Sequence, residues 1–269
     1  MLFRSYHTVE ARKVPAPGAV REPLSSIRRA QETALAREAS RIVCFSEYDL
    51  AENRRIFPEL SEKGVVIPPG VDDRFRHLPP REVARSYLGL PQGGMIFLLA
   101  ARGDAGKNAA AAVAAFRAMR DRWKGPAILL VAGQEGPEGG PGGDVLFLGS
   151  LPHAGMPMLF AAADAVVCPS PYESFGLVPL EALSGGVPVV VPDGTYWGDR
   201  IRTEGGGLVY PREEPDRFSG ALLAFASSPE LRARLSMEGA AVAAAFTWER
   251  CTASWAALLA SVSRPGNPR

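Results

Sequence analysis

The stretch CPSPYESFGLVPLEALSGGVPVVVPDG, residues 168–194, decides the fold of this chain. It follows the apolar run AVV and passes through a loop rich in Pro and Ser that contains Glu173. A helical pattern then begins near Gly176, carries Glu181 and leads into the apolar run PVVVP. A strand, a loop, a helix and a second strand in this order are typical of one unit of a parallel sheet.

The same alternation extends through most of the chain. Between the strands, the pattern predicts helices over residues 108–123 and 227–245, and a last helix over 248–262 with Thr247 as its N-cap. Nearly uninterrupted apolar runs indicate strands covered by helices on both faces. The fold class that follows is α/β, with a doubly wound parallel sheet. The predicted strands are RIVCF, VVIPP, MIFLLAA, AILLVAG, VLFLG, AVVCP and PVVVP.

The first forty residues have a different pattern. PAPGAVREP indicates a loop, and residues 24–40 indicate a charged helix that leads into RIVCF. We therefore predict that residues 1–40 are the remnant of another domain, that 41–247 form the main domain, and that 248–269 form a C-terminal helix and tail. Residues 135–144 are so rich in Gly, Pro and acid that we expect a flexible surface loop.

Composition excludes several classes of function. The formal net charge is +1, so the chain lacks the basic field that nucleic-acid binding needs. Its three cysteines form no CxxC pair, which argues against a metal or disulfide scaffold and for reduced thiols in the cytosol. No apolar run reaches the roughly 18 to 20 residues of a membrane span, and the first residues lack the apolar core of a signal peptide. We predict a cytoplasmic protein without a transmembrane segment.

Two groups of residues have the chemistry of a binding site. Glu173 and Glu181 flank the helix entry at Gly176, where free backbone N–H groups and the helix dipole favour an anion. Two carboxylates there can accept hydrogen bonds from sugar and ribose hydroxyls. Arg102 and Lys107 lie in the loop after the strand MIFLLAA, at the edge of a parallel sheet where ligands bind. These two cations can neutralise a diphosphate as it leaves, without a metal ion.

Residues 41–262 resemble the C-terminal, donor-binding half of the retaining GT-B glycosyltransferases (glycosyl transferases group 1, family 4). That large family includes sucrose-phosphate synthases, mannosyltransferases and the mycothiol glycosyltransferase. The resemblance implies a Rossmann-like domain that binds a nucleotide sugar over residues 41–247. It is carried by PPGVD, the pair Arg102 and Lys107, FLGSL, PSPYESFGLVPLEALSGGVPVV, GGGLVYP and FTWER.

The resemblance also implies a role for each matching residue. The residues matching Arg102 and Lys107 bind the donor diphosphate, Glu173 faces the transferred sugar, and Glu181 holds the ribose. The segment SYHTVEARK is similar to an acceptor-domain segment of the family, which makes His7 a candidate near the transferred sugar. The remaining donor-binding candidates are Ser174, Phe175, Gly176 and Leu177 beside sugar and phosphate, and Gly149, Ser150 and Leu151 near the base.

Some positions depart from the family pattern. Asn108 stands where Gly is common, and Asp199 stands where many members carry Glu. Asp199 has two interpretations, a helix cap or a partner for a sugar hydroxyl, whereas His77 and His153 are expected in loops without a role. From the resemblance we expect only the last helix or so of an N-terminal Rossmann domain before the linker, without the glycine-rich loop of that domain.

The implied function is transfer of a hexose from a UDP- or GDP-sugar to a hydroxyl acceptor with retention of configuration, without a cofactor or metal. One alternative is a non-catalytic fragment that binds nucleotide sugars and lacks the acceptor domain, with a homodimer or a partner chain to supply it. Another is a longer natural protein in which Met1 is an internal start. A sugar epimerase of related fold fits less well, because ESFGLVPLE belongs to transferases.

Overall fold

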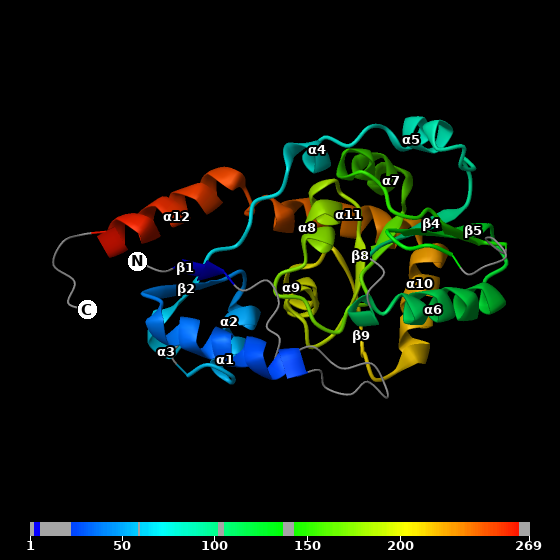
Figure 1. Cartoon of the computed structure of the whole chain (residues 1–269). Coiled ribbons are helices and arrows are strands. Elements are labelled where there is room, and N and C mark those ends of the chain that lie inside the picture. The colour runs from blue at the N-terminus through cyan, green and yellow to red at the C-terminus, as the bar shows by residue number, and fades with distance from the viewer. Residues whose placement is uncertain (1–2, 6–22, 59, 102–104, 137–142, 264–269) are drawn as a thin grey trace. The chain divides into compact units, whose positions relative to one another are not determined.

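The computed structural model describes residues 3–5, 23–58, 60–101, 105–136 and 143–263 (Figure 1). The chain divides by its contacts into two compact units. The first unit consists of Met1–Gly70, Glu173–Phe175 and Phe246–Arg269, and the second of Val71–Tyr172 and Gly176–Ala245.

The second unit contains a parallel sheet of six strands in the order β6-β5-β4-β7-β8-β9. Five of these strands are the apolar runs that the sequence predicts, and β9 is an addition to them. This confirms the predicted α/β class with its parallel sheet. The strands are β4 (Met95–Ala100), β5 (Ala127–Ala132), β6 (Val145–Phe147), β7 (Ala165–Val167), β8 (Val189–Pro192) and β9 (Gly207–Tyr210).

Helices cover both faces of this sheet, with α6 and α10 on one side and α5 and α7 on the other (Figure 1). Buried side chains such as Phe97 of β4, Phe116 of α6 and Phe225 of α10 pack in one core cluster. The helices of the unit are α4 (Asp73–Arg76), α5 (Arg81–Tyr87), α6 (Ala109–Arg122), α7 (Met156–Ala162), α8 (Leu177–Ser184), α9 (Tyr196–Glu204), α10 (Pro215–Ser227) and α11 (Pro229–Ala243), with short 3-10 turns η2 (Ala105–Lys107) and η3 (His153–Gly155).

The strand order contains a switch point. From β4 the chain moves outward to β5 and β6, and it then returns to β7 on the other side of β4 before continuing to β8 and β9. The connections that leave the carboxyl ends of β4 and β7 therefore run in opposite directions. In doubly wound sheets, ligands bind in the crevice at this point.

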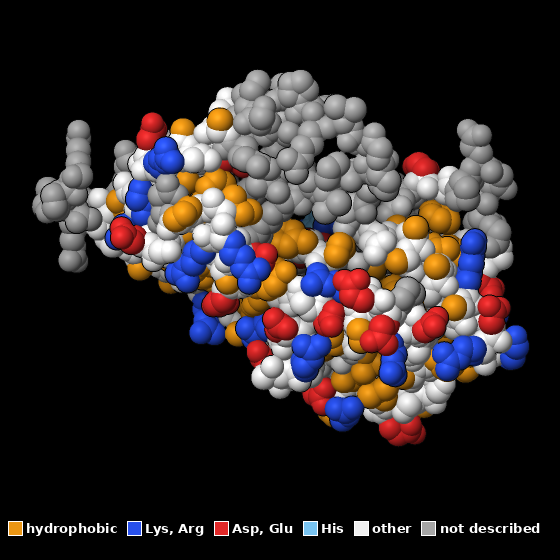
Figure 2. All heavy atoms as spheres, turned by 90° about the horizontal axis from the view of Figure 1, so that it is seen from below, with side chains coloured by type: hydrophobic (Ala, Val, Ile, Leu, Met, Phe, Trp, Pro, Cys, Tyr) orange, Lys and Arg blue, Asp and Glu red, His pale blue; other side chains and the backbone are white. Residues whose placement is uncertain are grey.

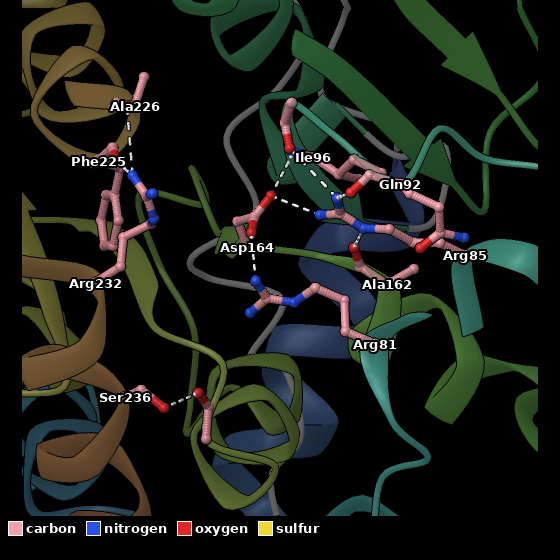
Figure 3. Close-up of polar contacts among 12 residues, drawn as sticks. Arg81, Arg85, Gln92, Ile96, Ala162, Asp164, Phe225, Ala226, Arg232 and Ser236 are labelled. Carbon is pink, nitrogen blue, oxygen red and sulfur yellow. Dashed lines mark hydrogen bonds and ion pairs between the residues drawn. The ribbon is translucent and has the colours of Figure 1, made fainter. Parts of the chain in front are cut away.

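A buried ion pair fixes the opposite, amino-terminal edge of the same two strands (Figure 3). Asp164, just before β7, accepts hydrogen bonds from the backbone N–H of Ile96 at 2.7 Å and from Arg85 Nη2 at 2.8 Å. Arg85 of α5 also donates to the carbonyl oxygens of Ala162 and Gln92. Because the donors of Arg85 meet several acceptors, this charge is compensated although it is buried.

The first unit has a parallel sheet of three strands, β1 (Phe3–Ser5), β2 (Arg41–Cys44) and β3 (Gly64–Val66), in that order. We expected RIVCF and VVIPP to join the main sheet, and this part of the prediction is wrong. Both runs do form strands, but they pair with β1 and with each other. Apolar patterning indicates that a strand exists and does not identify its partner.

The helices of the first unit are α1 (Pro23–Glu38), α2 (Glu47–Arg54), α3 (Leu60–Lys63) and α12 (Trp248–Ser263). Cys251 and Leu258 of α12 pack with Val43 of β2 and Ile67 in one buried cluster. Thr247 caps α12 as predicted, since its Oγ1 accepts from the N–H of Arg250 at 3.2 Å. Contacts thus group residues 41–70 and 246–269 together, whereas the sequence analysis assigned residues 41–247 to one domain.

Acidic and basic side chains are interspersed over the face shown in Figure 2, in line with the net charge of +1. Among the helices that the structure describes, none has the length and apolar character to cross a membrane. The described residues also contain no group of three or more His, Cys, Asp or Glu side chains that could hold a metal ion.

Candidate functional site

The carboxyl edge of the six-stranded sheet collects most of the predicted donor-binding residues that the structure describes. Because all six strands are parallel, the loops after β4, β6 and β7 open on the same edge. Lys107 follows β4, residues 149–151 follow β6, and Gly176, Leu177 and Glu181 follow β7. Glu173–Phe175 belong to the first unit. Arg102 and His7 lie outside the described residues, so their roles stay predictions.

The start of α8 has the backbone of an anion site. Gly176 is its N-cap with φ at 86°, and no side chain caps the first turn. A Cβ at Gly176 would lie 3.0 Å from Cδ1 of Trp197, so both the positive φ and the close neighbour call for glycine. Pro179 in the first turn has no N–H, which leaves the N–H groups of Leu177 and Val178 as the donors that an anion would meet.

Trp197 holds this turn in place and was missed by the sequence analysis. Its Nε1–H donates to the carbonyl oxygen of Gly176 at 2.9 Å, and its side chain is buried in α9. Tryptophan Nε1 is a donor only, so the bond fixes the direction of the carbonyl. No local pattern in the sequence links the two residues, because they are 21 positions apart.

The interpretation of Asp199 as a helix cap is wrong. Thr195 is the N-cap of α9, and its Oγ1 accepts from the N–H of Gly198 at 3.0 Å. Asp199 lies in the first turn, 64% exposed, with its Oδ1 3.6 Å from Arg202 Nη1. Thr195 already fills the capping position, and the carboxylate of Asp199 faces solvent.

The loop after β6 is tied to the loop after β5 through Gly149. Its N–H donates to the carbonyl of Gln134 at 3.1 Å, and its own carbonyl accepts from Gly133 at 2.7 Å. The φ of Gly149 is 63°, and a Cβ there would lie 2.8 Å from Oε1 of Glu135. Glycine at this position thus allows the backbone to turn toward Ser150 and Leu151, which are both exposed.

Apolar side chains project at this edge. Leu151 is 39% exposed and Leu177 is 50% exposed, although large aliphatic side chains are usually buried. Both are residues that the sequence analysis assigned to the donor. Ligand pockets combine apolar lining with a few well-placed polar groups, and these two leucines offer the apolar part.

Glu181 is the best-defined polar group of the edge. Its side chain is 13% exposed, and its Oε1 lies 3.4 Å from Nε2 of His153. On the other side of the ring, Nδ1 of His153 is 3.5 Å from Nη2 of Arg74. Arg74 in turn forms an ion pair with Asp72, with 2.7 Å between Nη2 and Oδ2. His153, which we expected in a loop without a role, begins η3 and contacts the carboxylate that we predict to bind the ribose.

The charges in this group shift each other's ionisation. Burial raises the pKa of Glu181, whereas the hydrogen bond and the charge of His153 lower it. Hydrogen bonds from Arg74 lower the pKa of Asp72 to about 2, so Asp72 is a stable anion at neutral pH. The Glu181 carboxylate is thus partly desolvated and has a strong tendency to accept hydrogen bonds.

Lys107 and Asn108 connect β4 to α6. Lys107 ends η2 and is half-buried. Asn108 has φ at 51° and is the N-cap of α6, and among the described residues it alone has a positive φ without being a glycine. Asparagine is one of the residues that tolerate this left-handed conformation. The backbone geometry therefore explains why asparagine can stand where the family commonly has glycine.

In the first unit, the backbone of residues 173–175 is held by buried groups. Ser46 Oγ donates to the carbonyl oxygen of Ser174 at 2.6 Å and accepts from the N–H of Asp49 at 3.0 Å. Phe175 packs edge-to-face on Phe246, with 5.4 Å between ring centroids. Ser46, which begins α2, is fully buried. The segment that carries Glu173 thus has a fixed backbone within its own unit.

Comparison with known families agrees with this geometry. The sequence profile described as "Glycosyl transferases group 1" matches residues 80–242, which is more than half of the chain and spans the six-stranded sheet. The chain belongs to the glycosyl transferases group 1.

Curated relatives in this group match different shares of the chain. A D-inositol 3-phosphate glycosyltransferase from Streptomyces scabiei is 31% identical over 275 residues, which cover 95% of this chain and 61% of the relative. An O-antigen chain mannosyltransferase B from Escherichia coli is 38% identical over 110 residues, or 41% of this chain and 28% of the relative. The chain thus spans about three fifths of the length of the first relative.

Solved structures show the same Rossmann-like GT-B fold. Sucrose-phosphate synthase from Thermosynechococcus elongatus superposes with a TM-score of 0.82 at 24% identity, covering 97% of this chain and 67% of that one. Anabaena HepE, solved with UDP and glucose, gives a TM-score of 0.77 at 19% identity and covers 96% and 71%. These likenesses establish the fold of the group 1 glycosyltransferase described here.

Proposed function

We propose that this chain is the donor-binding part of a retaining glycosyltransferase that transfers a hexose from a UDP- or GDP-sugar to a hydroxyl acceptor. The observation that carries the proposal is the position of Glu181 relative to the uncapped start of α8. Glu181 follows Leu177 by four residues, which corresponds to about 6 Å along the helix axis. A diphosphate at the helix start therefore leaves its ribose hydroxyls within reach of the carboxylate.

The names of similar proteins suggest the ligands to try first. HepE was crystallised with UDP and glucose, and the Streptomyces scabiei relative is named for D-inositol 3-phosphate. UDP is accordingly the first nucleotide to test, and D-inositol 3-phosphate is the first acceptor. The exposed leucines at positions 151 and 177 offer an apolar surface for the base or the sugar.

In the proposed reaction, the bond between the sugar's anomeric carbon and the diphosphate oxygen breaks, and a bond to the acceptor oxygen forms on the same face. The acceptor's proton passes to the departing diphosphate. Lys107, together with Arg102 and the N–H groups of α8, stabilises the negative charge that develops on that diphosphate. Glu173 orients the sugar, Glu181 orients the ribose, and His7 is a further candidate to act on the transferred sugar. These steps use no cofactor and no metal ion.

A second function is a nucleotide-sugar-binding chain without catalysis, with the acceptor domain supplied by another chain. Measurements of nucleotide binding and of sugar transfer distinguish the two functions. Both functions include nucleotide binding, and only the first includes sugar transfer.

The test is a thermal-shift titration of the chain with UDP, GDP and ADP, followed by an assay of sugar release and transfer. A ligand in hundredfold excess over its Kd stabilises the folded state by about 2.7 kcal/mol. We expect one nucleotide to raise the Tm of the wild type, and Arg102→Ala and Glu181→Ala to abolish most of the shift. Asp121→Ala, an exposed carboxylate near the far end of α6, is the matched control and should respond like the wild type. No shift with any nucleotide would contradict the proposal, and binding without transfer would support the second function.

A further inference from the structure

The side chains around Glu181 form a chain of polar contacts within the second unit. Asp72 pairs with Arg74, Arg74 lies against one nitrogen of His153, and the other nitrogen of His153 lies against Glu181. Asp72 and Arg74 come from the N-cap and first turn of α4, a helix that packs against α8. Three separate segments therefore meet at one carboxylate.

The contacts of His153 are compatible with one tautomer of a neutral ring. Arginine has only N–H donors, so a neutral His153 can accept from Arg74 through Nδ1, 3.5 Å from Nη2 of Arg74, when the ring proton is on the other nitrogen. The ring proton is then on Nε2, which is the nitrogen that lies 3.4 Å from Oε1 of Glu181. A neutral His153 can thus accept from Arg74 and donate to Glu181 at the same time. The ring is also supported from one side by Phe75, with 5.4 Å between centroids.

We propose that His153 is a positioning residue for nucleotide binding, which holds one oxygen of Glu181 so that the other is directed at the ribose hydroxyls. This inference rests on the proposed function. His153 takes one acceptor site of Oε1, and both acceptor sites of Oε2 are left for the ligand. Asp72 completes the arrangement from a distance, because its ion pair holds the guanidinium of Arg74 beside the ring.

The ionisation of Glu181 agrees with this role. Burial raises its pKa and the negative charge of Asp72 raises it further, whereas His153 lowers it. His153 is therefore the neighbour that favours the ionised form of the partly buried Glu181 side chain, which accepts hydrogen bonds through both oxygens. Without the ring, Glu181 would bind a proton more readily and would lose acceptor capacity.

The experiment is a double-mutant cycle on the 269-residue chain, with UDP, GDP and ADP as probes and calorimetry as the readout. We expect His153→Ala to weaken binding of the responding nucleotide about tenfold, and His153→Gln, whose side-chain N–H can reach Glu181, to regain most of it. In a Glu181→Ala background, His153→Ala should have no further effect, because residues that act through each other are not additive. His77→Ala, at an exposed histidine of the same unit, is the control and should bind like the wild type.

A second measurement needs no ligand. A carbon-13 NMR titration of the Glu181 carboxyl should give a higher pKa in His153→Ala than in the wild type, and a value closer to the wild type in His153→Gln. If none of the three nucleotides binds the wild type, the proposed function fails and the positioning role falls with it, although the titration can still show the contact between the two side chains. If the wild type binds and Glu181→Ala weakens it, yet His153→Ala binds normally or loses the same factor in both backgrounds, the inference alone is overturned.

Discussion

At the scale of single residues, Ser46 shows how a buried hydroxyl fixes a loop far away in the sequence. It is 128 positions from Ser174, and it provides a donor for that residue's carbonyl oxygen and an acceptor for the N–H of Asp49. Asp49 also accepts from Nδ2 of Asn53 at 2.9 Å, and all three polar side chains are buried. The hydrogen bonds of such a network stabilise the fold, although Oδ1 of Asn53 is buried without a hydrogen-bond partner among the described residues.

Replacing Ser46 by alanine should lower the free energy of unfolding by about 1 to 3 kcal/mol. The substitution removes the N-cap of α2 and leaves the carbonyl of Ser174 without this donor. Urea unfolding followed by circular dichroism measures the change. The control is Ser254→Ala, whose hydroxyl donates to Arg250 on the exposed face of α12 and should matter little. Equal stability of the two variants would contradict this account of the network.

The place of a single residue in the candidate site could be predicted only where that residue belongs to a recognisable sequence motif. Glu181 and the glycines at positions 149 and 176 belong to recognisable stretches, and the structure places them at the carboxyl edge of the sheet. Trp197 and His153 could not be predicted, because their roles depend on contacts with residues 21 and 28 positions away. A long-range hydrogen bond leaves no periodic signal in the sequence.

At the scale of elements, the predicted helices and strands are present in the structure, but other elements such as α9, α10 and β9 were not predicted. The predicted helix over residues 108–123 is α6 (Ala109–Arg122), and the one over 227–245 contains α11 (Pro229–Ala243). Both segments are rich in alanine, which is a strong helix former. Strand pairing could not be predicted in the same way, since β2 and β8 both consist of a few consecutive buried residues and yet lie in different sheets.

The attachment of α5 to the sheet depends on one buried carboxylate, so Asp164→Ala should be strongly destabilising. It would leave the guanidinium of Arg85, whose side chain is 3% exposed, without its counter-charge and the N–H of Ile96 without its acceptor. Breaking one side of a buried ion pair costs about 3 to 5 kcal/mol. Urea unfolding of the purified variant should show a loss of this size.

Arg81→Ala is the matched control for that experiment. Arg81 contacts the same carboxylate at 2.9 Å, but its side chain is 51% exposed, so its loss should cost under about 1 kcal/mol. Because Asp164 lies at the amino edge of the sheet, the folded fraction of either variant should bind nucleotide like the wild type. A large effect of Arg81→Ala, or a small one of Asp164→Ala, would contradict the view that the buried pair fixes α5.

At the scale of the whole molecule, the chain forms two units, one from a nearly continuous stretch of sequence and the other from separate segments. The second unit is continuous apart from residues 173–175, whereas the first gathers both ends of the chain and that short segment. The sequence showed one long α/β alternation from residue 41 onward and gave no sign of the division at residue 70. A division of this kind depends on which strands and helices pack together, and α12 packs with β2 although about 200 positions separate them.

Hydrogen exchange of the whole chain should show which unit a nucleotide contacts. A ligand suppresses local opening of the segments it touches. With the responding nucleotide bound, we therefore expect slower exchange at residues 149–155 and 176–185 and unchanged exchange in β2 and β3. Glu181→Ala at the same nucleotide concentration is the control and should lose most of this protection. A hollow lined by Pro91, Met95 and Arg120 lies at the amino edge of the same sheet. Protection confined to the amino edge would contradict a nucleotide site at the carboxyl edge of the strands. Equal protection in both units would indicate that the nucleotide stabilises the whole chain and does not bind at this local site.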